Sequence, residues 1–117
     1  MHILFVSPHC DPEANLGEPD SGGQCVYQHE LALALAEKGV KVTTFCRQTG
    51  KRLDVSDVHK NYTIQRIITG EKNFVPKEAI ESHMPAFVKG MHELVDKVHT
   101  DPAEPLVIHG HYWDCLL

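Results

Sequence analysis

The sequence has few basic residues, and this shortage limits the partners that it can have. Eleven lysines and arginines stand against 16 aspartates and glutamates, so the 117-residue chain carries a formal net charge of −5. A nucleic-acid-binding domain needs a basic face, and a site for a membrane surface needs a basic cluster. Lys51 and Arg52 are the only adjacent basic residues. We therefore expect neither nucleic acid nor a membrane as a partner.

Long hydrophobic runs are also lacking. The N-terminal segment has only four consecutive apolar residues, Ile3 to Val6, before a serine and a proline. This run is too short for the core of a signal peptide and far too short to span a bilayer. It is typical of a buried strand, which we expect at residues 2–8.

The cysteines lack the spacing of a metal site. The four of them, Cys10, Cys25, Cys46 and Cys115, form no C-x-x-C pair and no zinc pattern. We expect them to be reduced, small core residues of a cytoplasmic protein. Neither a metal nor a cofactor is expected, and both the G-x-G-x-x-G fingerprint and the Walker loop are absent.

The pattern of apolar residues predicts an α/β domain. Strands are expected at residues 2–8, 40–47, 62–69 and 105–112. One helical pattern runs from Tyr27 to Leu35 and ends at Gly39, and a second runs from Ile80 to Val98, where Pro85 should kink or split it. Residues 47–61 are expected to form a loop. This order favours a largely parallel sheet, whose ligands gather beyond the C-terminal ends of the strands.

The segment Asp-Ser-Gly-Gly-Gln at residues 20–24 has two interpretations. In one, it is a capping box in which Ser21 and Gln24 each bond the backbone amide of the other. In the other, Gly22 and Gly23 leave their amides free for an anion, assisted by the helix dipole. Glycine costs about 0.5–1 kcal/mol relative to alanine inside a helix, so a ligand that must approach the backbone would explain the pair. Composition alone leaves both interpretations open.

The segment His-Gly-His-Tyr-Trp-Asp at residues 109–114 is a second candidate. His109 and His111 share a strand face, but two histidines without a nearby third ligand more often pack or form hydrogen bonds than bind a metal. In one interpretation, Tyr112 and Trp113 simply bury aromatic area at the end of the sheet. In the other, His111 and Tyr112 offer hydrogen-bonding groups to a polar ligand.

Together these motifs resemble the N-terminal lobe of the retaining glycosyltransferases of family 4. The resemblance is carried by "SPH" after the first strand, by "DSGGQ-x-x-Y-x-x-E-L-A-x-A-L-A-x-x-G", by "FVPKEAI" and by "IHGHYWD", in this order over nearly the whole chain. It is closest to the sucrose-phosphate synthase and sucrose synthase branch. Cys10 and Cys115 are departures, because they put bulk where that branch has small residues.

The resemblance implies a two-lobed GT-B enzyme that moves a hexosyl group from a nucleotide sugar to a sugar or sugar-phosphate acceptor such as fructose 6-phosphate. Residues 1–117 would be a partial, acceptor-side Rossmann-like domain. Matched motif by motif, the acceptor would be bound by Gly22, Gln24, Lys77 and Tyr112. Gly23 and His111 complete the expected site, on the interpretations of their own segments given above. Lys77 would meet its phosphate. A stand-alone sugar-phosphate-binding or regulatory domain is the alternative.

The pair of glutamates that grips the nucleotide sugar in this family, spaced E-x7-E, is absent from the sequence. We therefore expect the donor to be bound by a C-terminal lobe that this chain does not contain, and the chain alone to be inactive. An exposed last strand should also make it marginally stable and prone to self-association.

Overall fold

A computed structural model describes residues 1–15 and 17–117 of the chain. Five strands form one sheet in the order β3-β4-β2-β1-β5. Their bounds are β1 His2–Val6, β2 Lys41–Arg47, β3 Val55–His59, β4 Tyr62–Ile67 and β5 Leu106–Gly110. The helices are α1 Gly23–Glu37 and α2 Met84–Val98, and the 3-10 helices are η1 Lys77–His83 and η2 Trp113–Leu116.

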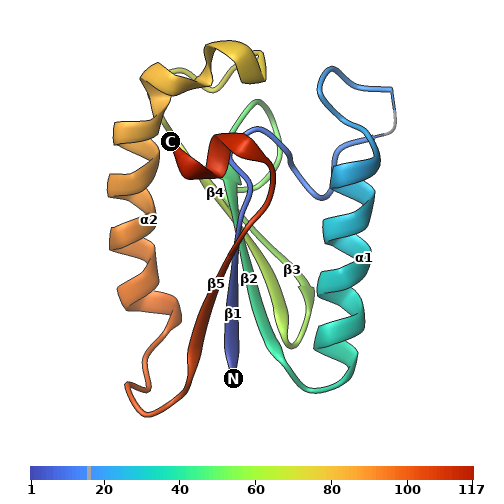
Figure 1. Ribbon diagram of the computed structural model, residues 1–117, viewed down its shortest axis with the longest axis vertical. Coiled ribbons are helices and arrows are strands. Elements are labelled where there is room, and N and C mark those ends of the chain that lie inside the picture. The colour runs from blue at the N-terminus through green and yellow to red at the C-terminus, as the bar shows by residue number, and fades with distance from the viewer. Residues whose placement is uncertain (16) are drawn as a thin grey trace.

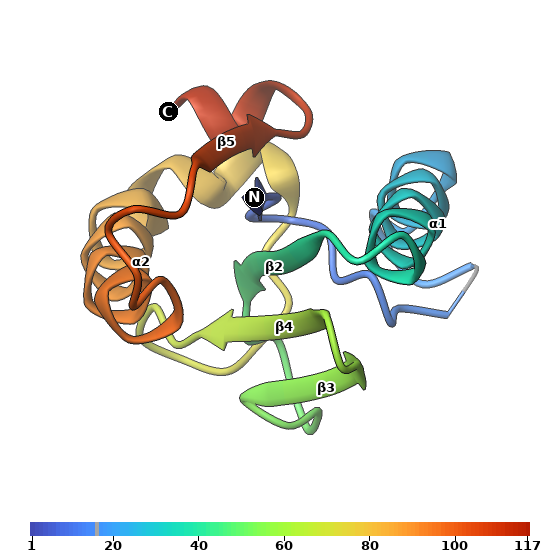
Figure 2. The ribbon, with the colours of Figure 1, turned by 90° about the horizontal axis from the view of Figure 1, so that it is seen from below.

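The sheet is mostly parallel, as the sequence predicts. Strands β4, β2, β1 and β5 run parallel, and only β3 pairs antiparallel, with β4. Helices α1 and α2 cover opposite faces of the sheet (Figure 2). The expectation of a loop over residues 47–61 is wrong for β3, a short edge strand whose side chains are all at least partly exposed.

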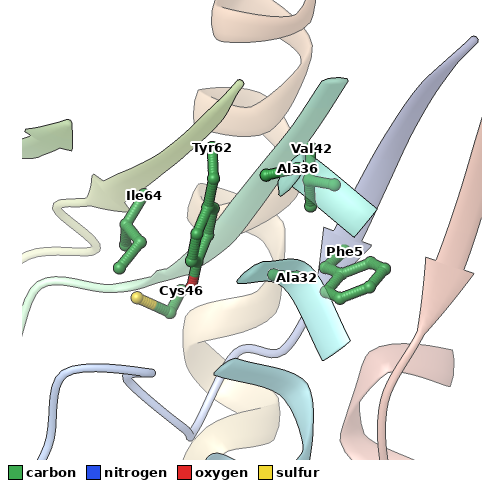
Figure 3. Close-up of a cluster of buried hydrophobic side chains, with 7 residues drawn as sticks. All are labelled: Phe5, Ala32, Ala36, Val42, Cys46, Tyr62 and Ile64. Atoms are coloured by element: carbon green, nitrogen blue, oxygen red, sulfur yellow. The ribbon is translucent and has the colours of Figure 1, made fainter. Parts of the chain in front are cut away.

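One hydrophobic core lies between the sheet and α1. It consists of Phe5, Ala32, Ala36, Val42, Cys46, Tyr62 and Ile64 (Figure 3). The alanines of α1 allow the helix to lie close to the aromatic side chains of the strands, and every member is at most 1% exposed. Burial raises the pKa of the Cys46 thiol well above its ordinary value, so this cysteine is an inert core residue.

A second core lies between the sheet and α2. Leu4 and Val6 face this side while Phe5 faces α1, because successive side chains of a strand point to opposite faces. Met84 and Phe87 of α2 close this core.

The predicted end of the first helix at Gly39 and the predicted split of the second helical region at Pro85 are both found. Gly39 follows α1 with a φ of +85°, and its N–H donates to the carbonyl oxygen of Ala36 at 3.0 Å. The Val40 N–H reaches back to the Leu35 carbonyl oxygen, which completes a Schellman motif. Pro85 lies in the first turn of α2, where the helical pattern divides into η1 and α2. A proline is tolerated there because the first N–H groups of a helix have no intrahelical partner.

The expectation that all four cysteines are reduced is wrong for one pair. Cys10 and Cys25 form a disulfide, with Cα atoms 5.8 Å apart, whereas Cys46 and Cys115 are free. The two cysteines are 15 positions apart in sequence, and they meet because α1 packs beside the loop that follows β1. Cys115 fills the space beside Gly110, where any Cβ would meet its sulfur.

The parallel strands bring distant segments to one end of the molecule. The loop after β1, the start of α1, η1 and η2 all lie at the end of the sheet opposite to the N-terminus (Figure 1). Each residue proposed from the sequence for the acceptor site lies in or directly beside one of the last three segments, or directly after β5. No helix in the described ranges is long and apolar enough to cross a membrane.

Candidate functional site

A hollow of about 300 Å³ opens at this end of the sheet. It is lined by His9, Asp20, Ser21, Gly22, Gly23, Gln24, Lys77 and Tyr112. Five of the six residues proposed from the sequence therefore lie side by side. Their role in binding an acceptor stays a prediction, but their convergence gives that prediction a defined place.

The two glycines face open space. A Cβ built on Gly22 or Gly23 would meet nothing within 4 Å, and neither residue has a positive φ. No acceptor in residues 1–15 and 17–117 takes either N–H group, and the first N–H groups of a helix have no intrahelical partner. The fold itself therefore does not require glycine here, whereas a ligand that touches the backbone would.

The capping-box interpretation is wrong. The N-cap of α1 is Gly22, and no side chain caps it. The Ser21 hydroxyl instead donates to the Asn15 carbonyl oxygen at 3.0 Å, and the Gln24 amide donates to the Ser7 hydroxyl at 3.0 Å. The other Gln24 atom, Oε1, is buried and has no partner in the described part of the chain, so the site keeps an unused acceptor.

Lys77 is held by Asp20 at the edge of the hollow. The Asp20 carboxylate accepts from the Lys77 backbone N–H at 2.9 Å and from its ammonium at 3.3 Å. Burial raises the pKa of Asp20, but these hydrogen bonds outweigh it and the net pKa is lowered. The hydrogen bond to Asp20 raises the pKa of Lys77. Lys77 is thus a fixed positive charge, and an anion in the hollow would share it with Asp20.

Tyr112 and Lys77 face each other across the hollow. The Lys77 ammonium lies 5.6 Å from the centroid of the Tyr112 ring, within the range of a cation–π contact. Tyr112 has a φ of +70°, which is uncommon for a residue with a Cβ and marks local backbone strain. This conformation turns the chain from β5 into η2 and leaves Tyr112 48% exposed.

His111 does not line the hollow. Its ring stacks on His109 with centroids 4.3 Å apart and packs edge-on against Phe5 at 4.6 Å. Burial, followed by the charge of His109, lowers the pKa of His111 to about 4, so the ring is neutral near pH 7. Its Nε2 is buried without a partner in the described residues. The hydrogen bond to an acceptor proposed for His111 therefore stays a prediction.

His9 is a site residue that the sequence-based selection missed. It lies in the "SPH" motif after β1 and borders both this hollow and a neighbouring one of about 250 Å³. Its Nδ1 lies 2.6 Å from Oδ2 of Asp114, which is fully buried in η2. The motif itself was the available signal, because it places a histidine directly after a parallel strand.

A buried arginine fixes the loop that carries His9. The Arg66 guanidinium in β4 donates to both oxygens of Asp11 at 2.6 and 2.9 Å, and to Glu13 at 2.8 Å. It also donates to the Leu53 carbonyl oxygen and the Ser56 hydroxyl. Burial lowers the pKa of Arg66, but the two carboxylates outweigh it and raise the pKa. The loop after β1 is therefore anchored by a charge-assisted fork.

The arrangement suits a small ligand that carries both hydroxyl groups and a negative charge. The Gly22 and Gly23 amides and the Lys77 ammonium are donors for an anion. Gln24 Oε1 and the free His9 nitrogen are groups for hydroxyls. No cluster of three metal-binding side chains occurs in the ranges that the structure describes.

The chain resembles known glycosyltransferases over nearly its whole length. The family described as Glycosyltransferase Family 4 matches residues 21–117. D-inositol 3-phosphate glycosyltransferases are similar, with 32% identity over 112 residues in Nocardiopsis dassonvillei (95% of this chain, 26% of the relative). The relative from Corynebacterium aurimucosum has 32% identity over 114 residues (97% and 26%).

A solved structure is similar as well. The sucrose-phosphate synthase from Thermosynechococcus elongatus superposes with a TM-score of 0.85 at 30% identity, covering 97% of this chain and 28% of that one. The chain thus spans about a quarter of the length of the curated relatives that it matches.

Proposed function

Because the chain belongs to glycosyltransferase family 4, and its sheet and helices match the Rossmann-like N-terminal lobe of a GT-B enzyme, we propose that it forms the acceptor-binding part of a retaining hexosyltransferase. The group transferred comes from a nucleotide sugar, and it passes to a hydroxyl of a sugar phosphate or of a related phosphorylated polyol. Gly22, Gly23, Gln24, Lys77 and Tyr112 bind this acceptor, and His111 offers it a further hydrogen bond.

One observation carries the proposal above all others. Gly22, Gly23 and Lys77 line a single hollow, and a Cβ on either glycine would meet nothing within 4 Å among the described residues. Backbone amides at a helix N-terminus together with an ammonium favour an anion such as a phosphate. The unused oxygen of Gln24 suits a hydroxyl of the same ligand.

The names of the relatives narrow the acceptor class. One group of relatives is named for inositol 3-phosphate, and the similar structure is a sucrose-phosphate synthase. The shared chemistry is a ring of hydroxyl groups that bears one phosphate. We therefore propose a phosphorylated ring polyol or sugar as acceptor, with inositol 3-phosphate and fructose 6-phosphate as the two compounds to compare.

The donor is proposed to bind outside the residues described. In a GT-B enzyme the nucleotide sugar is gripped by the second lobe, and the E-x7-E pair of that lobe is not found in this sequence. A cytoplasmic location also stays a proposal. The cysteines do not support this location, because Cys10 and Cys25 form a disulfide.

The proposal is tested by measuring the affinity of the chain for inositol 3-phosphate, fructose 6-phosphate and unphosphorylated inositol by calorimetry. We expect a phosphorylated compound to bind more tightly than inositol. Lys77→Met should reduce this preference about 10- to 100-fold, since a hydrogen bond to a charged group contributes about 1.5–3 kcal/mol. Lys89→Met is the matched control, because Lys89 is exposed on α2, away from the hollow.

The proposal fails if neither phosphorylated compound binds more tightly than inositol. If the preference exists but Lys77→Met leaves it unchanged, the phosphate is bound elsewhere and the role assigned to Lys77 is wrong. The regulatory-domain alternative would be favoured by a different result. In that case the chain binds the phosphorylated compound tightly, but a longer protein that contains the chain transfers no sugar.

A further inference from the structure

His9, which lines the hollow, and the buried Asp114 behind it form a pair with no role in the proposal so far. His9 follows β1, and Asp114 lies in η2 after β5. Because β1 and β5 are parallel neighbours, both segments emerge at the same end of the sheet (Figure 1). The two side chains are 105 residues apart in sequence and are in direct contact.

The geometry of this contact fixes where the histidine carries its proton. Oδ2 of Asp114 accepts the His9 backbone N–H at 3.1 Å and lies 2.6 Å from the ring Nδ1. A carboxylate only accepts hydrogen bonds, so Nδ1 must carry the hydrogen that it donates. In the neutral ring the other nitrogen, Nε2, is then an acceptor.

Nε2 is the atom that remains for a ligand. The His9 side chain is 5% exposed, and its ring borders both hollows and lies 5.0 Å from the Tyr112 ring, centroid to centroid. Within the described part of the chain, Nε2 has no hydrogen-bond partner. An oriented acceptor atom therefore lies among the donors contributed by Gly22, Gly23 and Lys77.

Asp114 is costly to bury for packing alone. It is 0% exposed, and its second oxygen, Oδ1, is buried without a partner in the described ranges. An unpaired buried oxygen of a charged group destabilises a fold, so a position that served only to fill space would be better occupied by an apolar residue. Among the described residues, its one side-chain partner is His9.

We propose that Asp114 is a positioning residue of the acceptor site. It holds the His9 ring as the Nδ1–H tautomer and so keeps Nε2 as a hydrogen-bond acceptor for a hydroxyl of the sugar or polyol. This inference rests on the proposed function for the identity of the ligand. Asp114 acts on the hydroxyl side of the ligand, whereas Lys77 acts on its phosphate.

The tautomer can be measured without any ligand. In the ¹⁵N-labelled 117-residue chain, the shifts and long-range couplings of the imidazole nitrogens should report a protonated Nδ1 and an unprotonated Nε2 for His9. Asn offers an N–H donor as well as an oxygen, so Asp114→Asn should allow the Nε2–H form to appear. A wild-type His9 that carries its hydrogen on Nε2 would overturn the proposal.

Binding separates positioning from a purely structural role. Asp114→Asn should weaken binding of inositol 3-phosphate and of unphosphorylated inositol alike, by about tenfold, as expected for one lost hydrogen bond. The preference for the phosphorylated compound should be kept, in contrast to Lys77→Met. Asp96→Asn, an exposed aspartate on α2, is the control and should change neither affinity.

A double-mutant cycle completes the test. Since Asp114 acts through His9, Asp114→Asn should cost nothing further when His9 is already alanine. Additive losses, or an Asp114→Asn variant that binds like the wild type, contradict the role of Asp114 while leaving the proposed function intact. Failure of the wild type to bind any phosphorylated polyol contradicts the proposed function, and the tautomer measurement then decides the pairing alone.

Discussion

At the scale of single residues, the hollow is defined as much by missing side chains as by present ones. Gly22 and Gly23 have neither a left-handed conformation nor a close neighbour that would demand glycine. The cost of Gly23 in the first turn of α1 is therefore not offset by any contact among the described residues. We expect ligand binding to offset that cost, so Gly23 should matter for affinity and not for the stability of the fold.

Gly23→Ala should accordingly weaken ligand binding without weakening the fold. An alanine has open space at this position and restricts the unfolded chain, so the free energy of unfolding should stay equal or rise by up to about 1 kcal/mol. Affinity for inositol 3-phosphate should fall, because the added methyl group lies between ligand and backbone. Urea unfolding and calorimetry measure the two quantities.

Gly50→Ala provides the comparison for this variant, because its Cβ also meets open space and it lies away from the hollow. It should leave affinity unchanged. If Gly23→Ala binds inositol 3-phosphate as tightly as the wild type, the glycines do not contact the ligand.

At the scale of secondary-structure elements, the site depends on how the loop after β1 is held. Arg66 of β4 ties this loop to the sheet through Asp11 and Glu13, and Cys25 of α1 ties it to the helix through Cys10. A hydrogen bond from Arg66, followed by that from Ser56, lowers the pKa of Glu13 against the effect of burial. The position of His9 is therefore set by β4, which does not line the hollow, and by α1, whose first residues do.

Arg66→Ala should lower the free energy of unfolding by about 3–5 kcal/mol, because it leaves the buried Asp11 carboxylate without its partner. The measurement is urea unfolding, with Lys89→Ala as an exposed control expected to stay within about 0.5 kcal/mol of the wild type. A loss no larger than that of the control would show that the fork does not anchor the loop.

The elements themselves could be largely predicted from the sequence. The parallel strands have β-branched and apolar residues, Gly39 ends α1, and Pro85 divides the second helical region. Strand β3 was missed because an edge strand with partly exposed side chains has no clear hydrophobic period. The pairings of Cys10 with Cys25 and of His9 with Asp114 also escaped, because each depends on tertiary contacts between distant segments.

At the scale of the whole molecule, the sheet has one apolar edge. Strand β5 is the last in the order, and Leu106, Val107 and Ile108 are 38%, 43% and 65% exposed. Leu116, in η2 after this strand, is 85% exposed. An exposed edge strand with apolar side chains offers unpaired backbone groups to another chain.

We therefore predict that the 117-residue chain self-associates through β5, and that Ile108→Lys favours the monomer because a charge at an edge blocks strand pairing. Sedimentation over a range of concentrations measures this. Lys60→Ile, at the turn between β3 and β4, is the control and should not shift the equilibrium toward the monomer. A wild-type chain that stays monomeric at high concentration would contradict the prediction.

The central claim is that one hollow, at the end of the sheet where the strands finish, binds a phosphorylated polyol or sugar. Titration of inositol 3-phosphate or fructose 6-phosphate into the ¹⁵N-labelled chain tests it most directly. We predict saturable shifts of the Gly22, Gly23 and Lys77 amides with a common affinity, and no shift at Lys60 and Asn61 at the opposite end of the sheet. Saturable shifts confined to that opposite end, or none at millimolar ligand, would contradict it.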